Sequence, residues 1–302
     1  MSILTFDIGG TSVKYAVWDE DRLKEKGSFS TPERWEMLKA ALLKVKKKVE
    51  KHFSLQGVAF SAPGAINQMD RQIEGVSEVP YIHFFPIYDE LEQVFELPVS
   101  FENDANCAGL AEIWRGAAVD KSSVLFVVLG TGIGGAIIVD GEIQHGHHLL
   151  GGEFGFMLLD GERTFSELGT AVAMARRYAK RMNIPTNKVS GEEVFQLAEQ
   201  GDAVAKEEVK TFFHYLVRGL YNLAYSFDPE VLLLGGGVSN KPDLIEKINE
   251  EMDDLFGRLR VPPYRPKVEL CQFKNDANLI GAVYHFLHTH ENMDKVVNRV
   301  PE

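Results

Sequence analysis

Short apolar runs alternate with amphipathic stretches along most of this chain. Runs rich in β-branched and aromatic residues predict strands, and apolar residues three or four positions apart predict helices. In the stretch 34–52, for example, Trp35, Leu38, Leu42 and Val45 share one helical face. The pattern predicts strands at residues 2–7, 12–18, 25–30, 57–61, 98–102, 231–234 and 267–272, and a hairpin at 123–139. It predicts helices at residues 34–52, 87–95, from 104 onward, 167–182, 191–200, 203–228, 241–257 and 276–289, before a polar tail at 290–302.

The alternation of strands and helices predicts an α/β protein. A chain of 302 residues has room for about two domains, and each half opens with a hairpin whose turn is rich in glycine. We therefore expect a small N-terminal domain of residues 1–106, completed by a C-terminal helix at about 276–302, and a large C-terminal domain of residues 107–275. Two such halves would meet at a cleft that holds nucleotide and substrate.

Glycine-rich turns follow three of the apolar strands. They lie in ILTFDIGGTSVKYAVWD, in SSVLFVVLGTGIGGAIIVD and in VLLLGGGVS near residue 235. The backbone N–H groups of such turns are open to anions, above all phosphate, because no side chain covers them. The turns predict an ATP site made by Gly9, Gly10, Thr11, Lys14, Gly130, Thr131, Gly132, Gly134, Gly135, Gly235, Gly236 and Gly237. Lys14 could instead be a solvated lysine of an edge strand, and the third turn, which would lie beside adenosine, could simply end a strand.

Polar residues follow the strand PVSFE and precede a helix at FENDAN. Ligands of α/β sheets collect at the carboxyl ends of strands. Asp104 could cap the helix. Beside a cleft it could instead take the proton from an alcohol that attacks the γ-phosphate of ATP, while Asn103 fixes neighbouring hydroxyls.

Two further carboxylates lie next to glycines. Asp7 could form an Asx-turn, or it could orient hydrated Mg²⁺, which prefers carboxylates, waters and phosphate oxygens. Glu153 lies in GGEFGF, where it could be solvated or could meet a ligand that approaches the backbone closely. The preceding HGHH, residues 145–148, lacks helical spacing and a nearby cysteine. We interpret it as a loop that borders the substrate pocket rather than as a metal site.

Composition argues against several function classes. The formal net charge is −12, and the lysines of KVKKKVEK form the solvated face of a helix, so neither nucleic acid nor an anionic membrane is expected as a partner. Cys107 and Cys271 are too few for a disulfide scaffold and suit a reducing compartment. Without a signal-peptide pattern or a membrane-spanning run, we expect a cytoplasmic protein. Walker, GxSxG and HExxH motifs are absent, and GTGIGG lies in a hairpin rather than in a βαβ unit.

Several motifs together resemble one family. DIGGTSVK, SAPG, ENDANC, LGTGIGG, GGEFG and LLLGGGV occur in the order of the ROK family of bacterial sugar kinases and repressors. The resemblance covers nearly the whole chain and implies the actin-like, ribonuclease-H-like fold of two α/β domains around a cleft. It implies that Asp104 is the catalytic base, that Asn103, Asp104 and Glu153 hold sugar hydroxyls, and that Gly64 of SAPG lies beside the substrate. A homodimer is expected by analogy with the family.

Two segments depart from the family pattern. Phe156 replaces a histidine that family members usually carry three residues after the glutamate of GGEFG. The family's cysteine-rich zinc motif downstream is also missing, so no structural zinc is expected. The aromatic face of Phe156 would stack on a pyranose ring, and Glu167 resembles the family's second sugar-binding glutamate. The segment EVPYIHFFP, residues 78–86, adds Tyr81, His83, Phe84 and Phe85. These side chains could contact an extra sugar or aglycone, with His83 in the substrate site, or they could be packed core residues.

EFGF, ENDANC and NDANLIGAVYHF are especially similar to bacterial β-glucoside kinases. The resemblance implies ATP- and Mg²⁺-dependent phosphorylation of the 6-hydroxyl of the nonreducing glucose in cellobiose and related β-glucosides. A glucokinase or an N-acetylmannosamine kinase is the alternative within the enzyme class. A sugar-responsive regulator is less expected, because the family's repressors carry a helix-turn-helix before the first hairpin, which here starts at residue 3. A silent ATP-binding module is disfavoured because Asp7, Asp104 and Glu153 are present.

Overall fold

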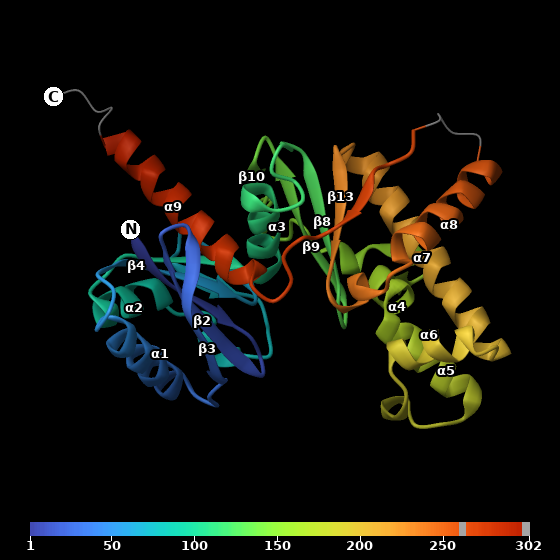
Figure 1. The fold of residues 1–302 in the computed structure, drawn as a ribbon, viewed down its shortest axis with the longest axis horizontal. Coiled ribbons are helices and arrows are strands. Elements are labelled where there is room, and N and C mark those ends of the chain that lie inside the picture. Colours follow the sequence, from blue (N-terminus) through green and yellow to red (C-terminus); the bar gives the residue numbers. More distant parts are fainter. Residues whose placement is uncertain (260–263, 298–302) are drawn as a thin grey trace. The chain divides into compact units, whose positions relative to one another are not determined.

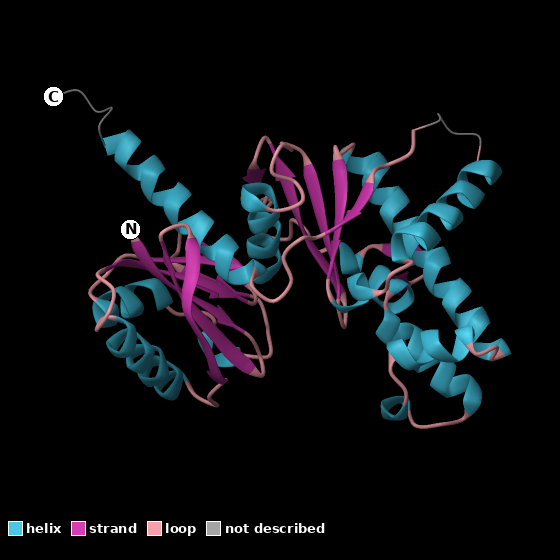
Figure 2. Ribbon diagram, viewed as in Figure 1, coloured by secondary structure: helices cyan, strands magenta, loops and turns pink. Residues whose placement is uncertain are grey.

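The computed structural model describes residues 1–259 and 264–297, with side chains through residue 290. These residues form two units (Figure 1). Unit 1 contains Met1–Gly116, Gly146–Leu150 and the segment from Asn275, and unit 2 contains Ala117–His145 and Gly151–Lys274. Each unit is built on one sheet with helices packed against it, as Figure 2 shows.

The sheet of unit 1 has the strand order β3-β2-β1-β4-β7. Its strands are β1 (Ser2–Ile8), β2 (Ser12–Asp19), β3 (Arg22–Ser30), β4 (Leu55–Ala62) and β7 (Val99–Asn103). The first three strands pair in antiparallel fashion, whereas β1, β4 and β7 are parallel. Every residue of β1 is buried, as expected for a strand that is covered on both faces of the sheet.

Helices cover both faces of this sheet. They are α1 (Trp35–Val49), α2 (Ile87–Phe95), α3 (Asp104–Arg115) and α9 (Ala277–Val297). Phe6 and Phe60 pack with the apolar sides of α1 and α2 in one hydrophobic cluster. On the other face, the hydroxyl of Thr5 donates to the carbonyl of Leu279 in α9. Alternate residues of β1 therefore meet different helices.

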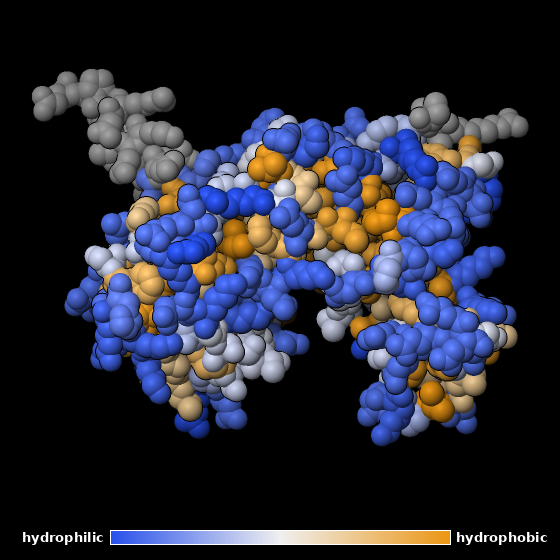
Figure 3. All heavy atoms as spheres, viewed as in Figure 1, coloured by the Kyte–Doolittle hydropathy of each residue, from blue (hydrophilic) through white to orange (hydrophobic). Residues whose placement is uncertain are grey.

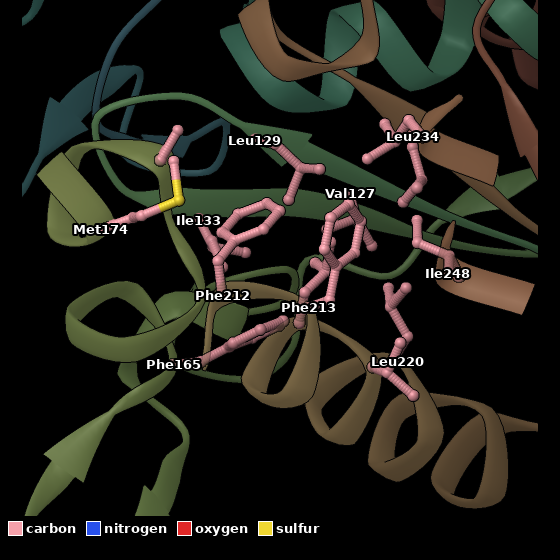
Figure 4. Close-up of a cluster of buried hydrophobic side chains, with 14 of the residues drawn as sticks. Val127, Leu129, Ile133, Phe165, Met174, Phe212, Phe213, Leu220, Leu234 and Ile248 are labelled. Atoms are coloured by element: carbon pink, nitrogen blue, oxygen red, sulfur yellow. The ribbon is translucent and has the colours of Figure 1, made fainter. Parts of the chain in front are cut away.

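Unit 2 has a sheet of order β10-β9-β8-β13-β14. Its strands are β8 (Val124–Leu129), β9 (Ile133–Val139), β10 (Glu142–Ile143), β13 (Val231–Gly235) and β14 (Val268–Leu270). Its helices are α4 (Phe165–Gly169), α5 (Ala171–Met182), α6 (Gly191–Glu199), α7 (Ala203–Phe227) and α8 (Leu244–Arg258). In Figure 4, Val127, Leu129 and Leu234 of the sheet lie near Phe212 and Leu220 of α7 in one buried cluster.

The predicted helices and strands are present, with local differences. The helix expected at 167–182 is two helices, because Thr170 leaves the helical conformation and its hydroxyl accepts from the N–H of Ala173, which caps α5. Two ribbons of very short strands were not predicted: β5 (Ala65–Asn67) with β6 (Gln72–Glu74), and β11 (Leu158–Asp160) with β12 (Arg163–Thr164). The expected polar tail is helical as far as Val297, and residues 298–302 lie outside the described part.

The surface view in Figure 3 is mostly hydrophilic, with hydrophobic residues in scattered groups. Within the part of the chain that the structure describes, no helix combines the length and the apolar character that crossing a membrane requires.

Candidate functional site

The carboxyl ends of the parallel strands in unit 1 bring polar residues into one row. Asp7 of β1 pairs with Ser61 of β4, and Ser61 pairs with Glu102 of β7. The hydroxyl of Ser61 donates to Oδ1 of Asp7 over 3.0 Å. Because the register aligns these strands, the first glycine turn, the SAPG segment and the FENDAN segment all start at the same edge of the sheet.

Asp7 is held by residues from distant parts of the chain. Its Oδ1 also accepts from Nδ2 of Asn278, at the start of α9, over 3.0 Å. Its Oδ2 lies 3.7 Å from Nζ of Lys14, whose side chain is 40% exposed. Asp7 itself is 8% exposed. No local pattern indicates the role of Asn278, since 271 residues separate it from Asp7.

The turn after β1 is hydrogen-bonded at Gly9 and exposed at the next two residues. The N–H of Gly9 donates to the carbonyl of Ser12, and the carbonyl of Gly9 accepts from the hydroxyl of Thr31. Gly10 and Thr11 are exposed. A Cβ added at Gly10 would lie 2.1 Å from Oε2 and 2.7 Å from Cβ of Glu78. A side chain outside the predicted set, that of Glu78, therefore lies directly over the glycine turn.

Asn103 and Asp104 begin helix α3. The cap is Asn103, whose Oδ1 accepts from the N–H groups of Ala105 and Asn106. Its Nδ2 donates to the carbonyl of Gly64 over 3.0 Å. Asp104 occupies the first turn of the helix and is partly exposed. Its Oδ1 accepts from the N–H of Ala105 over 2.8 Å. The helix is therefore capped by Asn103 and not by Asp104, for which the sequence had left capping as an alternative.

A buried carboxylate braces this turn from below. Glu102 is fully buried. Its Oε1 accepts from the N–H of Asn103 over 2.8 Å and from Nδ2 of Asn106 over 2.9 Å. Its Oε2 lies 3.6 Å from Nδ1 of His285 in α9. Burial, with a further contribution from the charge of Glu102, raises the pKa of the nearby Cys107 thiol, so this cysteine stays protonated and unreactive.

Gly64 and His83 are packed together. The φ of Gly64 is +107°, and a Cβ there would lie 2.8 Å from Cε1 of His83 and 2.9 Å from the carbonyl oxygen of Glu74. His83 is 9% exposed, and its Nε2 lies 2.7 Å from the hydroxyl of Ser77. Burial lowers the pKa of His83. Burial thus favours the neutral imidazole, which packs against Gly64.

In unit 2, the glycines of GGEFG fit against the hairpin β8–β9. A Cβ added at Gly152, where φ is +91°, would lie 2.2 Å from the carbonyl oxygen of Gly135. A Cβ at Gly155 would lie 2.2 Å from the carbonyl oxygen of Ile133. The loop needs glycine because its backbone touches the backbone of β9. This contact fixes the position of the backbone at Glu153, between the two glycines.

The second and third glycine turns lie side by side. They follow β8 and β13, which are parallel neighbours with Val128 opposite Gly235. The φ of Gly236 is +89°, and a Cβ there would lie 2.4 Å from the carbonyl oxygen of Leu129, just before the second turn. Ser166 of α4, which sequence reasoning missed, accepts from the N–H of Ile133 over 2.9 Å.

The other residues predicted for unit 2 are near the surface. Glu153 is exposed and Phe156 is 74% exposed, at the two ends of one short 3₁₀ turn. Glu167 is exposed and forms a capping box with Thr164 at the start of α4. The N–H and hydroxyl of Thr164 lower the pKa of Glu167. Its carboxylate is already used locally, so sugar binding by Glu167 stays a prediction.

The histidines of HGHH do not gather around a common centre. The rings of His147 and His148 contact each other, with centroids 4.8 Å apart. Within residues 1–259 and 264–297, no group of three or more His, Cys, Asp and Glu side chains is arranged to hold a metal ion.

The predicted residues thus form one group in each unit. In unit 1 the group is made by Asp7, Gly9, Gly10, Thr11, Lys14, Gly64, Asn103 and Asp104 at one sheet edge, with His83 beneath it. In unit 2 it is made by the turns of residues 130–135 and 235–237, beside the loop that carries Glu153.

Comparisons with known proteins agree with these motifs. The sequence model of the ROK family matches residues 3–289. A β-glucoside kinase of Klebsiella pneumoniae is 36% identical over 304 residues, which cover 97% of this chain and 99% of that protein. A solved ROK family protein from Streptococcus pneumoniae TIGR4, in complex with sucrose, is 37% identical with a TM-score of 0.88, and the match covers 97% of this chain and 100% of that chain.

A second solved structure is a ROK family glucokinase from Streptomyces griseus in complex with glucose and AMPPNP. It is 25% identical with a TM-score of 0.74, and the match covers 94% of this chain and 99% of that chain. These likenesses confirm the resemblance found in the sequence and the predicted actin-like α/β fold. The chain therefore belongs to the ROK family.

Proposed function

We propose that this enzyme, an ATP-dependent carbohydrate kinase, phosphorylates the 6-hydroxyl of the nonreducing glucose of β-glucosides such as cellobiose. The observation that carries the proposal is the start of α3, where Asp104 and Asn103 lie at the same sheet edge as the glycine turn of β1. Nearly full-length similarity to a β-glucoside kinase supports this choice of acceptor.

Asp104 is the proposed general base. One of its oxygens is held by the N–H of Ala105, which fixes the carboxylate while it receives the proton of the attacking hydroxyl. Asn103 is fixed by the helix that it caps and by the carbonyl of Gly64. A rigid pair of this kind positions an alcohol for in-line attack on the γ-phosphorus. Glu153 and Phe156 are also proposed to contact the sugar ring.

The glycine turns are proposed to bind ATP through their N–H groups. Thr11 and Thr131 add hydroxyls to these turns, and Lys14 adds a positive charge near the first. Preorganised N–H groups stabilise charge on the transferring phosphoryl group. Gly235 to Gly237 are proposed to lie along adenosine.

Asp7 fits an Mg²⁺ ion bound through water. The Oδ1 of Asp7 accepts from Ser61 and Asn278, whereas Oδ2 is the oxygen that faces Nζ of Lys14. A single buried carboxylate beside a phosphate site suits hydrated Mg²⁺, which retains several waters. When bound, the ion would neutralise phosphate charge.

Gly237→Ala tests the nucleotide site without damage to the fold. A Cβ at Gly237 would have no heavy atom of the described residues within 4 Å, so the variant should melt like the wild type. If adenosine lies against this turn, the added methyl group should raise KM for ATP about tenfold, because small-to-large changes at a close contact typically cost about 1–3 kcal/mol. Gly236→Ala is the contrast, because its Cβ would strike the carbonyl of Leu129 and lower the melting temperature. An unchanged KM in Gly237→Ala would contradict the assignment.

A substrate panel tests the proposed function. ADP release is measured with ATP·Mg²⁺ and cellobiose, gentiobiose, arbutin, glucose, mannose or N-acetylmannosamine. We expect kcat/KM to be highest for the β-glucosides. A preference for glucose or N-acetylmannosamine would overturn the proposal in favour of a monosaccharide kinase. An absence of turnover together with a gel shift on operator-like DNA would favour a regulator.

Three further expectations remain proposals. We propose that the two units, which the sequence predicts at residues 1–106 with the C-terminal helix and at residues 107–275, act as the two domains of the kinase. We also propose a cytoplasmic homodimer, with neither nucleic acid nor membrane as a partner. Because the cysteines of the family's zinc motif are replaced in DGERTFSELGTA, zinc analysis of the purified enzyme should find no stoichiometric metal.

A further inference from the structure

The structure separates the four aromatic residues of the segment 78–86. Tyr81 donates its hydroxyl to the carbonyl of Pro32 and packs against the core of unit 1. Phe85 packs edge-on against Trp35, with ring centroids 5.1 Å apart. His83 is buried. Phe84, by contrast, is 65% exposed, so most of its ring lies outside the core.

The backbone of Phe84 is strained. Its φ is +60°. This left-handed conformation is costly for a residue with a bulky side chain, whereas glycine adopts it readily. The N–H of Phe84 donates to the carbonyl of Ile73 in β6 over 2.9 Å, which holds the residue in place. Strain of this kind persists where the surroundings enforce it, and it occurs most often at functional sites.

Phe84 lies close to the group that holds the acceptor. It follows His83, and the two ring centroids are 6.1 Å apart. The imidazole of His83 lies beneath Gly64, whose carbonyl accepts from Asn103. At its other end the same loop places Glu78 over Gly10. The loop therefore runs from the glycine turn after β1, where Glu78 lies, to Gly64, where His83 lies. Phe84 is the next residue after His83.

We propose that Phe84 is a specificity-determining residue whose exposed ring binds the aglycone, the second ring of a β-glucoside. The glucose held by Asn103 and Asp104 would carry this aglycone on its anomeric carbon. The ring of Phe84 would stack on the C–H face of a second sugar or on a phenyl group. This role rests on the proposed β-glucoside kinase function. Free glucose has no aglycone and would gain nothing from Phe84.

Four proteins test this role: the wild type, Phe84→Ala, Phe84→Tyr and Phe84→Gly. We measure kcat and KM for cellobiose, arbutin and glucose, together with the melting temperature. Phe84→Ala should lower kcat/KM for both glucosides roughly three- to tenfold, the range expected when one aromatic contact is lost. Most of this change should appear in KM, and the value for glucose should stay within twofold. Phe84→Tyr should behave like the wild type.

Phe84→Gly distinguishes substrate binding from a structural role. Glycine adopts a positive φ without strain, so this variant should melt at or above the wild-type temperature and still lose its preference for glucosides. Met69→Ala is the matched control, because Met69 is an apolar residue 95% exposed at the turn of the neighbouring ribbon. It should leave all three substrates unchanged.

The outcomes separate the two proposals. A wild type that favours β-glucosides, combined with an unchanged substrate ratio in Phe84→Ala, would overturn the role of Phe84 alone. Equal losses on all three substrates with a lower melting temperature would also overturn it, as a structural effect. A wild type that phosphorylates glucose but not the glucosides would overturn the proposed function and the role of Phe84 with it.

Discussion

Replacement of Asp104 by asparagine is expected to lower kcat by about 10²- to 10⁴-fold, the usual contribution of a general base. Asparagine has nearly the same shape and can still accept from the N–H of Ala105, but it cannot take a proton from the sugar hydroxyl. The variant should keep the wild-type melting temperature and should still bind cellobiose in a calorimetric titration.

Asp120→Asn provides the control for the Asp104 variant. Asp120 is an exposed carboxylate after α3, so this substitution makes the same chemical change away from the site and should leave ADP release unchanged. Turnover by Asp104→Asn within a few-fold of the wild type would show that another group removes the proton. A loss of sugar binding equal to the loss of turnover would show that Asp104 acts in binding.

Gly281→Ala is expected to destabilise the protein by about 3 kcal/mol, at the upper end of the usual cost of overpacking. Gly281 lies on α9 where this helix packs against α3. A Cβ there would lie 1.7 Å from the carbonyl oxygen and 2.7 Å from Cα of Cys107. Because the obstacle is backbone, no rotamer change relieves it, and the two helices must separate. Urea denaturation should show the transition that reports on unit 1 at a lower denaturant concentration.

Gly257→Ala makes the same substitution in another helix. Gly257 is exposed on α8, and a Cβ there would meet no heavy atom of the described residues within 4 Å. Alanine has the higher helix propensity, so this variant should be more stable by about 0.5–1 kcal/mol. If both variants shifted stability in the same direction, the close packing of α9 on α3 would not be the cause.

The sequence predicted the elements whose signal is local. Glycines after an apolar strand indicated the three turns, and polar residues between the strand PVSFE and an amphipathic helix indicated the position of Asp104. The register of β1, β4 and β7 then placed Asp7 beside Ser61. This register could not be predicted from the sequence, because it depends on the pairing of strands about fifty residues apart and not on the pattern of any single segment.

Other features depend on tertiary contacts that leave no local pattern. Asn278 donates to Asp7 from the far end of the chain, and Ser166 of α4 accepts from the N–H of Ile133 in β9. The glycines of GGEFG are required by the backbone of β9, a reason that the motif itself does not reveal. The split between α4 and α5 arises because Thr170 uses its hydroxyl as a cap, which interrupts an otherwise helical pattern.

The position of α9 in unit 1 has a consequence for biosynthesis. Thr5 and Asp7 have hydrogen-bond partners in Leu279 and Asn278, which leave the ribosome only after the whole of unit 2 has been translated. During elongation, the first sheet lacks the helix that covers one of its faces, whereas the strands and helices of unit 2 are already present. The unit that carries Asp104 is therefore completed only after all of unit 2 has been translated.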